Sequence, residues 1–418
     1  LLRYSLPTIA TMVFTSLYGV VDGLFVSQFA GKTAFAAINI VIPYLVIVSS
    51  IGYMVGTGGS AVVAYAFGQG KAEHANRAFS LLVYVALALG VVFSAMSFVF
   101  ADYIVVVLGA SEELVGYCTL YLRITLVSLP AYILQSAFQT FFATAGKPRY
   151  GFRVACAAGL ANIVLDALLV GAAGFGIAGA AVATVIGEFI GGFVPFFYFM
   201  RKNNSSSLHL GKTSFDIHII RSAFFNGTSE LVTNVAMSVV SVVYNQQLMR
   251  LIGQDGVAAY GVIMYVSMIF AAVYYGYSTG TAPLMSYQYG AANCGEMQSL
   301  LAKGLTFIGL CGIAMVLLAQ LFARPLAQMF VGYDASLCAM TEQAFREFSL
   351  SFGIMGFSIF GSALFTSLGN GIVSAAISCL RTLVFEVGSV IVLPMLFGVG
   401  AIWLSVVVAE SASLVMTV

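Results

Sequence analysis

The feature that most constrains this chain is a succession of long apolar stretches, separated by short clusters of glycine, proline and charged residues. A helix needs roughly 20 apolar residues to cross the hydrocarbon core of a bilayer. Because 61% of the residues are hydrophobic and only 8% are charged, lipid must solvate most of the surface. We predict an all-α membrane protein of twelve transmembrane helices, with approximate limits 5–27, 34–67, 76–100, 114–144, 151–172, 177–200, 218–249, 257–288, 298–323, 340–367, 372–396 and 399–418.

One polar segment, RKNNSSSLHLGKTSFDI at residues 201–217, interrupts this pattern between the sixth and seventh stretches. It predicts a linker between an N-lobe, residues 1–200, and a C-lobe, residues 218–418. Most lysines and arginines outside the spans fall on the side of the N-terminus and the linker. By the positive-inside rule, both are expected in the cytoplasm, in a multi-pass protein of the cell (inner) membrane.

The two halves of the chain repeat each other. A shift of 222 residues lays the first half on the second without a gap, pairing Gly31 with Gly253, Ala37 with Ala259, Gly58 with Gly280, Gly68 with Gly290 and Glu188 with Glu410. Six spans return a chain to its starting side, so the two copies are expected to be parallel, related by an axis along the membrane normal.

Several classes of function are excluded by composition and motifs. A net charge of +1 offers no basic surplus for binding nucleic acid. The six cysteines are dispersed, without CxxC pairs or metal-like spacing, which is typical of small buried apolar residues. The glycine-rich GTGGS at Gly56 lacks the GK[ST] ending of a phosphate-binding loop, and no hydrolase motif is present. We expect neither an enzyme nor a bound cofactor.

Carboxylates deep in spans are costly and are therefore functional candidates. Asp22 in the first span, Asp166 in the fifth and Thr184 in the sixth reach the outer half at 1.5 Å of rise per residue. Asn162 lies one helical turn before Asp166, on the same face. These oxygens are suited to holding Na⁺, or a proton shared between the acids. Alternatively, each acid only hydrogen-bonds across helices. Pro7 permits bending of the helix that carries Asp22 and is the candidate hinge.

The other intramembrane charges have different interpretations. Glu188 and Glu410 are repeat-related, which favours a shared packing role. Arg381 is interpreted as the counter-ion of an acid on a neighbouring span, since Glu386 is five residues away on the same helix. Glu230, early in the seventh span, has no acidic counterpart in the first half and is the candidate carboxylate for a cationic substrate.

The eighth span is unusually rich in tyrosine and methionine. Met264, Met268, Tyr274 and Tyr275 are candidate substrate contacts, because aromatic rings attract organic cations and methionine packs adaptably. Packing against lipid or other helices explains the same residues equally well.

Four segments carry a family resemblance: LPTIATMVFTSLYGVVDGLFVSQFAG from Leu6, ATAGKPR from Ala143, ANIVLDALLV from Ala161 and GIAGAAVAT from Gly176. Together they resemble the multidrug and toxic compound extrusion (MATE) family of secondary transporters. The resemblance covers essentially the whole chain and is nearest to the MepA-like and DinF-like branch. It implies two six-helix lobes around a central cleft, exchanging Na⁺ or H⁺ for drugs.

In the archaeal and DinF-like branch of the family, a first-helix aspartate fifteen residues after a proline acts with a fifth-helix Asn-x-x-x-Asp and a sixth-helix threonine. The resemblance therefore implies a cation site at Asp22, Asn162, Asp166 and Thr184, with Pro7 at the corresponding proline. The chain departs from the NorM-like branch, whose acids lie in the seventh and tenth helices, because its tenth span has no acid.

These observations predict an antiporter that exports small amphipathic cations by alternating access, driven by H⁺ or Na⁺. We expect it to work as a monomer in the bilayer, with no nucleic-acid partner. A flippase for lipid-linked precursors, as in a sister branch, would need cationic residues in the cleft, and the spans contain few arginines. An enzyme or receptor would need a nucleophile, a metal cluster or a large sensory domain, none of which the sequence shows.

Overall fold

The computed structural model describes residues 2–201, 204–332 and 334–417. Within them the regular structure is entirely helical. The first half comprises α1 (Leu2–Phe25), α2 (Gly31–Gly68), α3 (Ala72–Val99), α4 (Ala101–Val107), α5 (Glu112–Leu126), α6 (Leu129–Thr144), α7 (Pro148–Asp166) and α8 (Gly176–Met200). The second half comprises α9 (Ile217–Leu251), α10 (Gln254–Gly290), α11 (Cys294–Val331), α12 (Ala335–Phe348), α13 (Phe352–Ser367), α14 (Gly371–Cys379), α15 (Val387–Phe397) and α16 (Ser405–Thr417).

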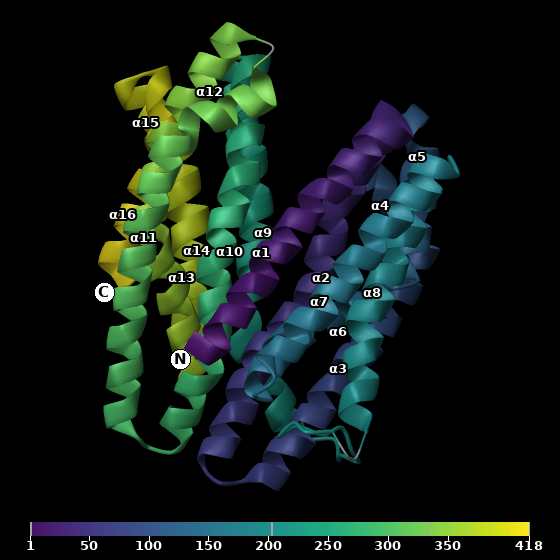
Figure 1. Ribbon diagram of the computed structural model, residues 1–418, viewed down its shortest axis with the longest axis vertical. Coiled ribbons are helices and arrows are strands. Elements are labelled where there is room, and N and C mark those ends of the chain that lie inside the picture. Colours follow the sequence, from purple (N-terminus) through teal and green to yellow (C-terminus); the bar gives the residue numbers. More distant parts are fainter. Residues whose placement is uncertain (1, 202–203, 333, 418) are drawn as a thin grey trace.

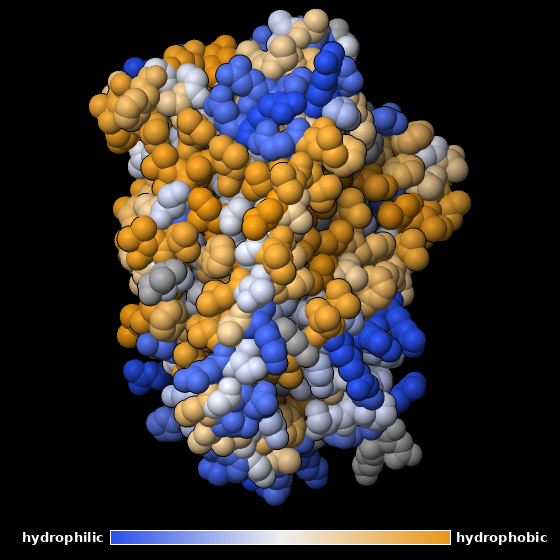
Figure 2. Space-filling model, turned by 60° about the vertical axis from the view of Figure 1, so that its left-hand side comes forward, coloured by the Kyte–Doolittle hydropathy of each residue, from blue (hydrophilic) through white to orange (hydrophobic). Residues whose placement is uncertain are grey.

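Ten described segments are long and apolar enough to cross a membrane, and the pair α5 and α6, bent by 60°, makes an eleventh. Helix α9 has 35 residues but is more polar than the others. Its length allows it to cross as well, which accounts for the twelve predicted spans. The exposed surface agrees, because a broad apolar belt separates two polar ends (Figure 2).

Buried side chains form two hydrophobic cores. The members of one come from residues 26–223, and those of the other come from residues 240–406. The two bundles lie side by side, close together at one end and apart at the other (Figure 1). Helices α1 and α9 begin at the same end, so the repeats are parallel, as predicted.

Glycines make the close contact between the bundles. A methyl group on Gly58 of α2 would overlap the α9 backbone at Ala223, and one on Gly276 of α10 would overlap the α1 backbone at Ile9. Repeat-related Gly68 and Gly290 face each other across the same junction. These contacts lie in the first half of α1 and α9 and the last half of α2 and α10. The bundles are therefore joined at the end that carries the start of α1.

The segment between α8 and α9 is tied to α3. Among its described residues, 204–216, the backbone N–H of His209 donates to the Asn76 amide oxygen at 2.7 Å, and that of Gly211 donates to the Ser80 hydroxyl at 3.0 Å. The linker is therefore packed against the N-lobe bundle. Residues 202–203 of the predicted linker lie outside the described part of the chain.

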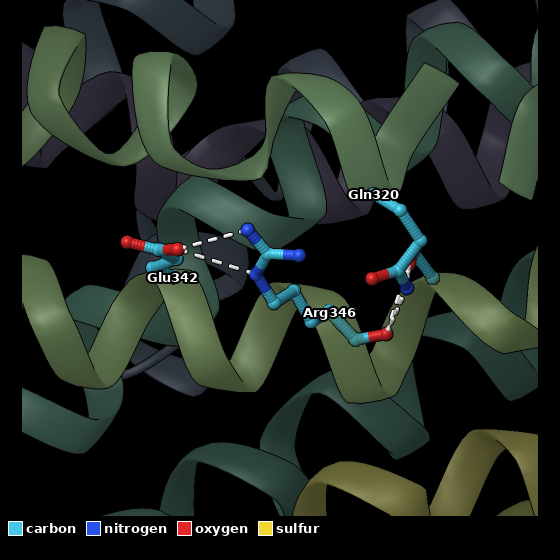
Figure 3. Close-up of polar contacts among 4 residues, drawn as sticks. Gln320, Glu342 and Arg346 are labelled. Carbon is cyan, nitrogen blue, oxygen red and sulfur yellow. Dashed lines mark hydrogen bonds and ion pairs between the residues drawn. The ribbon is translucent and has the colours of Figure 1, made fainter. Parts of the chain in front are cut away.

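A polar clamp stabilises the junction of α12 with α13, where a short 3₁₀ segment, Ser349–Ser351, interrupts the α-helical hydrogen bonds. The amide of Gln320 on α11 donates to the Arg346 carbonyl at 2.7 Å and to the Ser349 hydroxyl at 3.0 Å (Figure 3). The Arg346 side chain pairs with Glu342 at 3.0 Å. The Gln320 bonds supply a partner to a carbonyl near the end of α12.

Candidate functional site

The two candidate aspartates of the N-lobe lie beside irregular turns of helix. Asp166 is the last residue of α7 and directly precedes a π-helical segment, Ala167–Ala172. Asp22 lies four residues before a second π-helical segment, Val26–Ala30. Single π turns inside α-helices occur frequently at functional sites, because they interrupt the regular hydrogen bonding. Helices α1 and α7 pack against each other, which brings both acids to one place.

The carboxyl groups of Asp22 and Asp166 lie close enough to interact directly. Asp166 is fully buried, and neither of its oxygens meets hydrogen-bond geometry with any partner in the described residues. One oxygen of Asp22 and the amide oxygen of Asn162 are likewise buried and unpartnered there. Buried polar atoms in native proteins are nearly always bonded, so this cluster requires a proton, a cation or water.

Thr184 of α8 completes the group that the sequence predicts. Its hydroxyl donates to the Ala180 carbonyl at 3.1 Å within its own helix, which leaves the oxygen lone pairs available. The Thr184 side chain also lies next to the hydroxyl of Tyr121 on α5, and Tyr121 lies within electrostatic range of Asp22, Glu188 and Asp166. The structure therefore brings Asp22, Asp166 and Thr184 into the neighbourhood of Tyr121, with Asn162 one helical turn before Asp166 on α7. The sequence did not indicate this tyrosine, because a single aromatic residue in an apolar span is typical of a buried packing residue.

The donor set consists of carboxylate, amide and hydroxyl oxygens. Among the described residues there is no group of three or more His, Cys, Asp or Glu side chains that could hold a metal ion. Oxygen ligands of mixed charge suit hard cations, whereas transition metals favour imidazole and thiolate. The cluster thus fits a proton or Na⁺ better than a transition metal.

Two other intramembrane acids are already bonded. Glu188 on α8 accepts a hydrogen bond of 2.6 Å from the Ser128 hydroxyl at the bend between α5 and α6. Glu410 on α16 pairs with Arg381 through its Oε1 atom, at 2.7 Å from Nη2 and 2.8 Å from Nε. The prediction that Arg381 neutralises an acid on a neighbouring span is confirmed.

The C-lobe holds a polar cavity of about 530 Å³, lined by Glu230 and Tyr275 among others. Glu230 lies next to the Thr57 hydroxyl of α2, so this cavity reaches the junction between the lobes. A second cavity of about 490 Å³ is lined mainly by α1, α6 and α7.

A family model described as MatE matches residues 7–168 and again residues 231–391. The chain belongs to the MatE family. The two matched blocks correspond to the two halves of the sequence repeat. This MatE chain is accordingly a multi-span membrane transporter and not an enzyme.

Curated relatives support this assignment over nearly the whole length. The multidrug export protein MepA of Staphylococcus haemolyticus (strain JCSC1435) is 25% identical, in an alignment covering 98% of this chain and 90% of that protein. MepA of Staphylococcus aureus (strain NCTC 8325 / PS 47) is 24% identical, with the same coverage of both.

Solved structures share the fold. A multidrug resistance MATE family transporter in an outward-facing conformation superposes with a TM-score of 0.94 at 22% identity, covering 99% of this chain and 93% of that one. A MATE crystal structure described as straight gives the same TM-score and coverage at 21% identity.

The predicted substrate residues of α10 separate into two groups. Tyr274 is buried, and its hydroxyl donates to the Phe352 carbonyl at 2.6 Å, so the structure places it in the core of this MatE lobe and not at the cavity. Tyr275 lines the cavity. Met264 and Met268 are 36% and 48% exposed and share the helix face of Tyr275 by the 3.6-residue period, beyond the cavity lining.

Pro7, the predicted hinge, lies inside α1, and its carbonyl accepts a 2.8 Å hydrogen bond from the Thr11 hydroxyl.

Proposed function

We propose that this MatE-family chain is a secondary multidrug exporter that exchanges H⁺ or Na⁺ for amphipathic organic cations. The observation that carries the proposal is the set of buried, unpartnered oxygens at Asp22, Asn162 and Asp166. An ion arriving at these oxygens supplies the missing partner, so binding is coupled to the state of this cluster. Relatives named multidrug export proteins support the export of drugs.

Alternating access is supported by the one-sided junction between the lobes. The close glycine contacts seal the end that carries the start of α1, while the bundles separate toward the other end (Figure 1). With the N-terminus and linker in the cytoplasm, this arrangement is outward-facing. The cation enters between the lobes, binds in the N-lobe, and the lobes then rock to expose the drug site inward. Pro7 is the proposed hinge, and the proposed unit is a monomer.

Amphipathic cations suit the exposed face of α10. Met264 and Met268 provide adaptable apolar contact on that face. A diphosphate-bearing lipid fits less well. Arg381, the deeply buried arginine of the described spans, is already neutralised by Glu410.

The test uses purified chain in proteoliposomes loaded with ethidium. A pH gradient or a Na⁺ gradient is imposed separately, and efflux is followed by fluorescence. The Asp22→Asn variant should lose gradient-driven efflux. Asp102→Asn is the matched control, because Asp102 is an exposed acid on α4 that pairs with Arg123 at 2.9 Å. Gradient-driven efflux of normal rate in Asp22→Asn would contradict the proposal.

A further inference from the structure

The C-lobe cavity is lined mainly by residues that carry a hydroxyl group. Ten of its fifteen lining residues carry a hydroxyl group, and only Ala282, Ile359 and Ala363 are apolar. Drug-binding pockets are normally lined by apolar and aromatic side chains with few polar groups. The cavity of α1, α6 and α7 fits that description better, since Met12, Phe138 and Phe142 line it. The two cavities therefore suit ligands of different polarity.

The hydroxyl groups of one wall are fixed by a continuous chain of contacts between α9, α13 and α14. It runs from Ser229 to Thr366 at 3.5 Å, from Thr366 to Ser374 at 2.7 Å, from Ser374 to Ser362 at 2.8 Å and from Ser362 to Ser378 at 3.1 Å. Either oxygen of each pair can donate. The wall therefore presents a rigid polar surface, which needs little reorganisation to meet a hydroxylated ligand.

One hydroxyl that lines the cavity lacks a hydrogen-bond partner within the described part of the chain. Ser278 of α10 is 5% exposed, and its Oγ atom is buried without a hydrogen bond among the described residues. A buried hydroxyl without a hydrogen bond is destabilising unless a ligand or water supplies the missing partner. Its position in the cavity wall points to a ligand with hydrogen-bonding groups.

The charge of the cavity favours a cation. Glu230 is a carboxylate in the lining, and the charge of Arg381 is offset by Glu410. Glu386 lies near Arg381 and Glu410 and is not among the lining residues. The remaining negative charge in the wall is that of Glu230, which a single ammonium group neutralises.

We propose that this cavity binds a small hydrophilic monocation that carries several hydroxyl groups, of the amino-sugar class. Its ammonium group pairs with Glu230, and its hydroxyls bond to Ser278 and to the hydroxyl wall. This gives the exporter a second substrate class, separate from amphipathic drugs. The inference rests on the proposed function for transport of such a ligand, but its binding test does not depend on ion coupling.

The experiment measures binding to the purified chain by isothermal titration calorimetry. D-glucosamine is the probe, with D-glucose as its neutral analogue and tetraphenylphosphonium as a lipophilic cation. We expect glucosamine to bind at least tenfold more tightly than glucose. Glu230→Gln should weaken glucosamine at least tenfold, and Ser278→Ala about three- to tenfold, which corresponds to one hydrogen bond. Thr306→Ala is the control, because this exposed α11 hydroxyl lies outside the cavity and donates to the Ala302 carbonyl of its own helix.

Thermal unfolding of each variant shows whether it is folded, and Ser278→Ala keeps the test decisive if Glu230→Gln is unstable. Equal affinity for glucose and glucosamine, or unchanged glucosamine binding in both variants, overturns the proposal. Titration of Na⁺ alone identifies a simple cation site. If Na⁺ binding depends on Glu230 and glucosamine does not bind, the proposal is wrong. Ethidium efflux driven by an ion gradient is scored separately, so failure here is distinguishable from failure of the proposed function.

Discussion

Under the proposed alternating access, replacing Gly276 by alanine should shift the balance between the outward and inward openings. A Cβ atom at this position of α10 would lie too close to the α1 backbone at Thr8 and Ile9 for the two helices to keep their contact. Backbone atoms cannot move aside as a flexible side chain does. The added methyl group therefore destabilises the state in which the lobes meet at this end.

The size of the effect follows from the contact. Overpacking a tight interface by one methyl group typically costs about 1–3 kcal/mol, and roughly 1.4 kcal/mol corresponds to a tenfold change in an equilibrium. The ratio of the two conformations should therefore shift by about 5- to 150-fold. Gly261→Ala is the matched control on the same helix, because a Cβ atom there meets nothing within 4 Å. It should leave the ratio unchanged and favour the helix slightly.

The assay is pulsed electron–electron resonance between spin labels on introduced cysteines, in a background without reactive native thiols. One pair, at Lys71 and Glu296, spans the closed end, and the other, at Glu113 and Ala339, spans the open end. Gly276→Ala should lengthen the first distance and shorten the second in a larger fraction of molecules. Identical distance distributions for the parent, Gly276→Ala and Gly261→Ala would refute this reasoning.

Three further predictions concern other parts of the chain. Arg381→Ala should destabilise the fold by about 3–5 kcal/mol in detergent unfolding, since it leaves Glu410 buried and unpaired, whereas replacing both residues by apolar ones should cost much less. The Leu337 backbone N–H, and then the hydroxyl and N–H of the preceding serine, hold the pKa of Asp334 below its usual range. This stabilisation is present above the unfolded-state pKa and is lost as pH falls through the folded-state pKa. Amide exchange at the start of α12, corrected for intrinsic rates, should therefore accelerate below about pH 4. Asp334→Asn should remove that pH dependence. Pro7→Ala should slow ethidium efflux several-fold while leaving Na⁺ binding unchanged, and equal loss of both would show that α1 had been damaged as a whole.

Much of the scaffold is predictable from the sequence, because lipid imposes a simple length and polarity rule on each span. The repeat-related glycines identified by a shift of 222 residues, Gly58 with Gly280 and Gly68 with Gly290, all face the junction between the lobes in the structure. Their spacing could be read from the sequence, but not their function as contact points. That function depends on how two helices cross, which a single chain pattern does not specify.

The acids of the candidate ion site stood out by their depth in the spans, because carboxylates there are costly. Depth did not separate them from Glu188 and Glu410, which the structure shows to be bonded to Ser128 and Arg381. Tyr121 did not stand out, because nothing distinguishes it from other aromatic residues of the spans. The polar C-lobe cavity was missed for a related reason. Its hydroxyl-bearing residues are distributed over six helices, α2, α6, α9, α10, α13 and α14, and each of the serines and threonines alone resembles one bonded to its own helix.

The most direct test of the account is equilibrium binding of the coupling ion to the purified chain. Binding of radioactive Na⁺, and proton uptake or release in weak buffer, are measured for the parent, Asp166→Asn and Asp102→Asn. Opposite unit charges about 4 Å apart attract by about 4 kcal/mol at an effective dielectric constant near 20, so loss of one carboxylate should weaken ion binding by roughly three orders of magnitude. The account predicts that loss for Asp166→Asn and normal binding for Asp102→Asn. Normal ion binding in Asp166→Asn would contradict it.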